Sequence, residues 1–115
     1  MGRKSLGKEG LAVEALGAIA AVGNNVRTAR KRRGWGLEEM AGSMLVARKT
    51  LSRLEAGDPS VGLSVLAAAL HVLGMAGELS RVAAPESDEI GKFFEKRRLP
   101  ERVRKKQAPA QNLDF

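Results

Sequence analysis

Apolar residues recur at three- and four-residue spacing along most of the chain, which is the pattern of amphipathic helices. This spacing continues through residues 11–33, although Gly23 and the two asparagines after it favour a break there. The clearest apolar face spans residues 63–73 and is followed by Gly74, a residue typical of helix ends. No segment alternates apolar and polar residues as a half-buried strand would. The pattern predicts an all-α protein with five or six helices, at residues 11–33, 37–43, 48–56, 63–73, 77–83 and 87–98.

The last predicted helix has its charges placed to suit the helix dipole. Ser87 is a typical N-cap, Asp88 and Glu89 follow in the first turn, and basic residues occupy positions 96–98. Pro100 is expected to end this helix. The basic stretch after it and the weakly hydrophobic end of the chain predict a disordered tail.

Composition narrows the possible functions. The chain of 115 residues has room for one domain of ordinary size, and its 43% of hydrophobic residues can form a core. The absence of Cys excludes disulfides, thiolate zinc sites and cysteine nucleophiles. The single His argues against a histidine-rich metal site or a His-based catalytic triad. We therefore expect no metal, no cofactor and no enzymatic activity.

The charge points to a polyanionic partner. The net charge is +7, and the positive charge is concentrated in residues 1–33 and 91–115. A small basic domain of this kind most often binds nucleic acid. Glu9 and Glu14 disfavour a signal peptide at the apolar run over residues 11–22, and that run is too short to cross a bilayer. We expect no membrane association and a cytoplasmic location at the nucleoid.

Residues 37–57 have the pattern of two short helices that share an apolar interior and are joined by a tight turn near Met44. The second helix of this pair would expose a polar side rich in cations. Arginine and lysine on the first turn of such a helix can reach guanine O6 and N7 in the major groove. The candidate base-contacting residues are Arg48, Lys49, Ser52 and Arg53.

Here the sequence resembles a known family. The run GWGLEEMAGSMLVARKTLSRLEAGDPSVGLSVLAAAL is similar to the helix-turn-helix of the Cro-repressor (Xre) family of bacterial regulators, over about residues 23–74. The segment LSRLEAGDPS is the most specific part of the match. The resemblance implies a lambda-repressor-like helical bundle that binds double-stranded DNA.

The resemblance also implies roles for single residues. It matches the candidate base-contacting residues named above to the family's base-contacting positions. Glu55 matches a buried carboxylate that pairs with an arginine of the first helix, here Arg30. Ser60 matches a phosphate-contacting position, and we expect Arg32 and Arg33 of the basic cluster to contact the DNA backbone as well.

Two positions depart from the family pattern. Leu45 stands where the turn usually has Gly, which predicts a turn that is strained or differently shaped. Ala47 stands at the usual polar N-cap of the recognition helix, so that helix lacks a capping bond worth about 0.5–2 kcal/mol.

The region after Gly74 has a second resemblance, carried by Asp88-Glu89-Ile90-Gly91, Arg98-Leu99-Pro100 and Arg102-Val103-Arg104. These short matches are similar to the downstream part of small Xre-type proteins that are paired with HipA-like kinase toxins. In such pairs the DNA-binding protein acts as antitoxin and autorepressor. The apolar residues of this region are expected to contact a second copy or a toxin, chiefly Ile90, Phe93 and Phe94, with Leu79 and Val82.

The sequence thus predicts a sequence-specific transcriptional repressor that binds an operator of its own operon. A homodimer is expected, because one short helix reads too few base pairs for a genomic search. The alternative is an antitoxin whose main task is to bind and neutralise a HipA-like kinase toxin. The predicted parts are a flexible basic N-terminus at 1–10, a helix-turn-helix DNA-binding domain at 11–84, a C-terminal contact helix at 85–100 and a basic disordered tail at 101–115.

Overall fold

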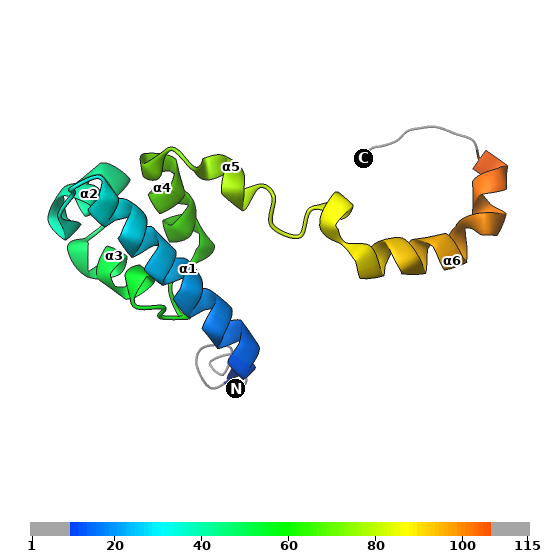
Figure 1. Ribbon diagram of the computed structural model, residues 1–115, viewed down its shortest axis with the longest axis horizontal. Helices are drawn as coiled ribbons and strands as arrows, with labels where there is room; N and C mark the ends of the chain where they lie inside the picture. The colour runs from blue at the N-terminus through cyan, green and yellow to red at the C-terminus, as the bar shows by residue number, and fades with distance from the viewer. Residues whose placement is uncertain (1–9, 107–115) are drawn as a thin grey trace. The chain divides into compact units, whose positions relative to one another are not determined.

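The computed structural model describes residues 10–106 and their side chains as far as Arg98. Within this part of the chain there are six α-helices and no strand, which confirms the all-α prediction (Figure 1). The elements are α1 (Val13–Arg32), α2 (Leu37–Met44), α3 (Arg48–Glu55), α4 (Leu63–Leu73), α5 (Ala76–Leu79), the 3-10 helix η3 (Pro85–Ser87) and α6 (Glu89–Lys106). Of the predicted flexible N-terminus, only Gly10 lies within the described residues. Of the predicted tail, only residues 101–106 do.

The chain divides into two units after Leu79. The first unit contains α1 to α5, and the second, from Ser80 onwards, contains η3 and α6. The first unit therefore ends before residue 84, where the sequence placed the end of the DNA-binding domain.

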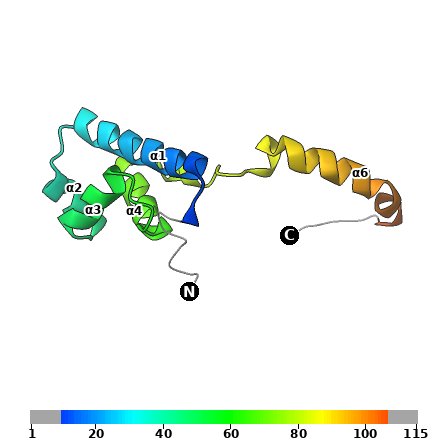
Figure 2. The same cartoon turned by 90° about the horizontal axis from the view of Figure 1, so that it is seen from below.

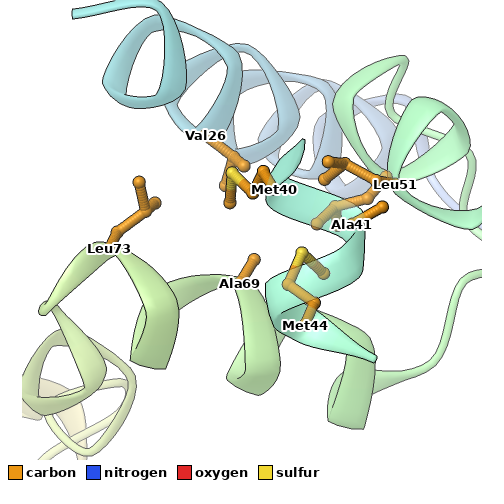
Figure 3. Close-up of a cluster of buried hydrophobic side chains, with 8 residues drawn as sticks. Val26, Met40, Ala41, Met44, Leu51, Ala69 and Leu73 are labelled. Atoms are coloured by element: carbon orange, nitrogen blue, oxygen red, sulfur yellow. The ribbon is translucent and has the colours of Figure 1, made fainter. Parts of the chain in front are cut away.

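The first unit is built on α1, which lies along the group formed by α2, α3 and α4 (Figures 1 and 2). Each of these four helices contributes apolar side chains that converge on one core (Figure 3). Aliphatic and methionine side chains make up this core, in a chain with only 3% aromatic residues. The core residues are Val26, Met40, Ala41, Met44, Leu51, Leu54, Ala69 and Leu73.

The first helix passes very close to the end of α3 at Gly23. A Cβ atom at this position would collide with the carbonyl oxygen of Leu54 and would lie 2.9 Å from that of Glu55. The break expected at Gly23 is wrong, because α1 is continuous through this residue. The glycine is instead required for the contact, since any side chain there would push α1 away from α3.

Three helices of the first unit end on a glycine in the left-handed conformation. Gly34, Gly57 and Gly74 have φ angles of 72°, 80° and 79°. At each of them the amide N–H donates to a carbonyl three residues earlier, and the next amide donates five residues back. This Schellman arrangement satisfies carbonyl groups that the last helical turn would otherwise leave without a partner.

The beginning and end of α6 differ from the prediction. The N-cap is Asp88 rather than Ser87, because the Asp88 carboxylate accepts a hydrogen bond of 2.8 Å from the Gly91 amide, while Ser87 belongs to η3. The helix continues through Pro100 to Lys106, so residues 101–106 are helical and not part of a disordered tail. Proline disfavours a helix interior because it lacks an N–H donor, but here it removes only one bond of a long helix.

Candidate nucleic-acid interface

The turn between α2 and α3 keeps its tight shape around a strained residue. Leu45 has φ 61° and ψ 41°, in the left-handed region that glycine adopts more readily. The Leu45 amide donates a hydrogen bond to the Gly42 carbonyl at 3.1 Å, and the Val46 amide donates to the Ala41 carbonyl at 3.0 Å. Of the two outcomes predicted for this position, the structure shows strain in a preserved turn. The Leu45 side chain is 90% exposed, so packing does not compensate the strain.

The helix that follows has one buried side and one exposed side. Leu51 and Leu54 are buried in the core, whereas the polar side chains of Arg48, Lys49, Ser52 and Arg53 are exposed. These four residues form two pairs at four-residue spacing, so they share one side of α3, which we call the α3 polar face. The sequence predicted this set, and the structure brings its members together. Ala47 provides no side-chain cap for α3, as expected.

The cations of the α3 polar face differ in whether another side chain of the protein holds them. The side chains of Arg48 and Lys49 form no hydrogen bond or ion pair with the described residues. Arg53 instead donates from Nε to the Asp58 carboxylate at 3.2 Å. The first turn of α3 thus presents two uncommitted cations, and the second turn presents one that is anchored at its base.

A small hydrogen-bond network orders the loop after α3. The Ser60 amide and hydroxyl both donate to the Asp58 carboxylate, at 2.9 and 2.7 Å. These bonds, chiefly the one from the amide, lower the pKa of Asp58 below its ordinary value, and Arg53 contributes in the same direction. Ser60 is exposed beside α3, but its hydroxyl proton is used within the loop. Its contact with a phosphate stays a prediction.

Beneath the α3 polar face the structure pairs Arg30 of α1 with Glu55 of α3. Arg30 donates from Nε and Nη2 to the two carboxylate oxygens of Glu55 at 2.7 and 2.9 Å. Its Nη1 donates to the Trp35 carbonyl at 2.9 Å. The side chains of Arg30 and Glu55 are only 8% and 2% exposed. The bond to Glu55 raises the pKa of Arg30, so this guanidinium stays charged.

Two further arginines, Arg27 of α1 and Arg33 at its C-cap, interact within the domain. Arg27, which the sequence analysis did not single out, lies 3.6 Å from Glu55 and is about half exposed. Arg33 donates to the carbonyls of Ala29 and Leu73 and lies over the Trp35 ring. Arg33 therefore caps the end of α4, a structural role that its place in a basic run concealed. Arg32 is exposed, as a contact with the DNA backbone requires.

The residues predicted for dimer or toxin contact lie in the second unit, except for Leu79. Ile90, Phe93 and Phe94 of α6 are 71%, 56% and 56% exposed, and Val82 is exposed as well. Leu79, at the end of the first unit, is half-buried.

These features agree with the comparison to protein families. A family model described as a helix-turn-helix domain matches residues 21–82. The chain belongs to the helix-turn-helix domain family. The matched segment contains the α2–turn–α3 unit and the buried Arg30–Glu55 pair, and the chain is accordingly a DNA-binding protein of the helix-turn-helix type. No curated protein and no solved structure matches the chain.

Parts of two helices lie outside the segment that the helix-turn-helix family matches: the start of α1 and the whole of α6. Helix α1 begins at Val13, before the matched segment, and α6 lies entirely after it. Among the described residues, no helix is long and apolar enough to cross a membrane, and no group of acidic or histidine side chains is arranged to hold a metal ion.

Proposed function

We propose that this protein is a sequence-specific transcriptional repressor of the Cro-repressor (Xre) type, which binds as a dimer to an operator of its own operon and has no enzymatic activity. The observation that carries the proposal is the α3 polar face. It combines two uncommitted cations, Arg48 and Lys49, with Ser52 and Arg53 on the second helix of a helix-turn-helix.

The dimensions of α3 suit this role. Its eight residues correspond to a length of about 12 Å, comparable to the width of the major groove. The buried Arg30–Glu55 pair fixes α3 to α1, so the α3 polar face is held on a rigid support. On a helix that enters the groove by its N-terminus, Arg48 and Lys49 lie deepest and Ser52 and Arg53 follow one turn later.

The test compares specific and non-specific binding. An operator is first selected from a random duplex pool with the full-length protein, and dissociation constants are then measured for the operator and for a scrambled duplex over a salt series. A bidentate base contact discriminates by about 1–3 kcal/mol, so Arg48→Ala should reduce the ratio of the two constants by about 5- to 150-fold. Folding should be unaffected, because the Arg48 side chain is exposed and forms no hydrogen bond or ion pair with the described residues.

Arg32→Ala is the matched control, since Arg32 is an exposed arginine outside α3. This variant should weaken binding to both duplexes alike and reduce the salt slope by nearly one unit, as expected for a lost phosphate contact. If Arg48→Ala leaves the specificity ratio unchanged, α3 is not the recognition helix and the proposal fails.

The exposed residues of α6 support the second candidate function, an antitoxin that binds a HipA-like kinase toxin. The two candidates differ in what covers Ile90, Phe93 and Phe94: a second copy of the chain or the kinase. The antitoxin function requires a kinase-like gene beside this one, whose purified product binds this protein and loses activity on binding. Absence of inhibition by the purified pair would reject it.

A further inference from the structure

Helix α6 exposes large apolar side chains that the helix-turn-helix domain does not use. Within its own unit α6 contacts η3. Ile90, Phe93 and Phe94 are each more than half exposed, and the two phenyl rings lie 5.8 Å apart. Adjacent aromatic residues with this exposure mark a surface that a partner covers.

The apolar residues form a stripe that ends in a cation. Ile90, Phe93, Phe94 and Arg97 follow the spacing of successive helical turns, and we call them the Phe93 stripe. The Arg97 guanidinium lies over the Phe93 ring at 5.6 Å. The spacing of this stripe, about two turns long with one polar member, is that of a coiled-coil seam, in which a polar residue favours one register.

The charges beside the Phe93 stripe indicate which partner helix packs against it and in which orientation. Glu89 and Lys96 are seven residues apart, so they flank the stripe on the same side, one near each end. In an antiparallel pair of α6 helices, Glu89 of each copy faces Lys96 of the other. A parallel pair would instead place the acidic starts of both helices together and the basic ends of both together.

The helix dipoles also favour the antiparallel arrangement. Glu86 and Asp88 lie just before α6 and Glu89 begins it, whereas Lys96, Arg97 and Arg98 lie near its middle. Antiparallel packing over the Phe93 stripe brings the acidic start of one helix next to the basic middle of the other and opposes the two dipoles. Glu89 already contacts Lys92 at 3.2 Å, but its side chain is 80% exposed and remains accessible to a second cation.

We propose that α6 is the self-association element of this protein, and that the Phe93 stripe packs against the same stripe of a second copy in antiparallel orientation. This inference rests on the proposed function, because it assigns the surface that makes the repressor a dimer. With Glu89 opposite Lys96, the two-fold axis lies close to Phe93, so the phenyl rings of the two copies meet near the axis.

The first test measures the oligomeric state of the full-length protein by sedimentation equilibrium. Burial of one phenyl side chain corresponds to about 1.5–3 kcal/mol, so Phe94→Ser should raise the dimer dissociation constant by at least about tenfold. Val13→Ser is the matched control, because Val13 is 84% exposed but lies in the first unit. It should leave the constant unchanged. A parent that stays monomeric at all concentrations, or equal effects of both variants, would overturn the inference.

The second test determines orientation by charge reversal. Glu89→Lys and Lys96→Glu should each weaken self-association, because each places like charges opposite one another. An equimolar mixture of the two variants should form a heterodimer, and the double variant should associate like the parent. Failure of both the mixture and the double variant to recover association rules out antiparallel pairing.

Binding of DNA separates this inference from the proposed function. Variants that cannot dimerise should bind the operator more weakly, while their preference for one half-site over a scrambled duplex is retained. A parent that dimerises through α6 but shows no sequence preference would refute the repressor proposal and leave the α6 pairing intact. A monomer with full sequence preference would refute the pairing alone.

Discussion

Removal of Glu55 should destabilise the first unit more than any other single change to its polar groups. Glu55→Ala deletes the acceptor of two short hydrogen bonds and leaves the Arg30 guanidinium in a site where its side chain is 8% exposed. The bond from Arg30 to the Trp35 carbonyl remains, but no carboxylate faces the charge. A buried ion pair broken on one side typically costs about 3–5 kcal/mol, because the remaining charge is desolvated without compensation.

That cost is a large part of the stability of a small domain, which is about 5–15 kcal/mol. We expect the melting temperature to fall by more than about 10 °C. The assay is urea denaturation followed by circular dichroism, with the free energy of unfolding obtained by linear extrapolation. Arg30→Ala should also be strongly destabilising, although Arg27 at 3.6 Å retains one cation near the stranded Glu55 carboxylate.

Two controls separate the buried pair from its neighbours. Arg27→Ala removes a half-exposed partner of Glu55 and should cost less than about 1 kcal/mol. Replacement of both members, Arg30→Met with Glu55→Leu, should recover much of the loss, since neither charge is then left buried. If both single alanine variants unfold within about 0.5 kcal/mol of the parent, the pair is not a structural element and this reasoning is wrong.

Three further outcomes follow from the backbone and the loop. Leu45→Gly should stabilise the domain by about 0.5–1 kcal/mol, because relief of the left-handed strain exceeds the added entropy of the unfolded chain and the exposed side chain loses no packing; a lower urea midpoint would contradict this. Gly23→Ala should destabilise by at least about 1–3 kcal/mol through collision with the end of α3, whereas Gly17→Ala, on the same helix with open space around it, should stabilise by about 0.5–1 kcal/mol. Equal effects of the two glycine changes would refute the close approach. Because folding lowers the pKa of Asp58, the stability that its carboxylate contributes is fully present above the ordinary aspartate pKa and is lost as the pH falls below it. Carbon-13 NMR titration should show this low pKa, and Ser60→Ala should raise it towards the ordinary value; no change in the variant would exclude Ser60 as the cause.

Local sequence patterns determined the helices and the two sides of α3. Helical periodicity depends on neighbours three and four residues apart, so Leu51 and Leu54 could be separated from Arg48 and Lys49 without knowledge of the fold. Helix ends at Gly34, Gly57 and Gly74 follow equally from local backbone preference. The pairing of Arg30 with Glu55 joins residues far apart in the chain, and only the resemblance to a family made it predictable.

Tertiary structure decided the roles that depend on distant contacts. Gly23 read as a helix break because the carbonyl groups that exclude a side chain there belong to α3. Arg33 was assigned from the sequence to the DNA backbone alone, because its acceptor inside the domain, the Leu73 carbonyl, lies at the end of α4. Leu45 was identified as unusual from sequence, but only the assembled domain determined that its turn is preserved under strain. Helix periodicity is a property of neighbouring residues, whereas close approach and hydrogen-bond partners depend on how separate helices pack.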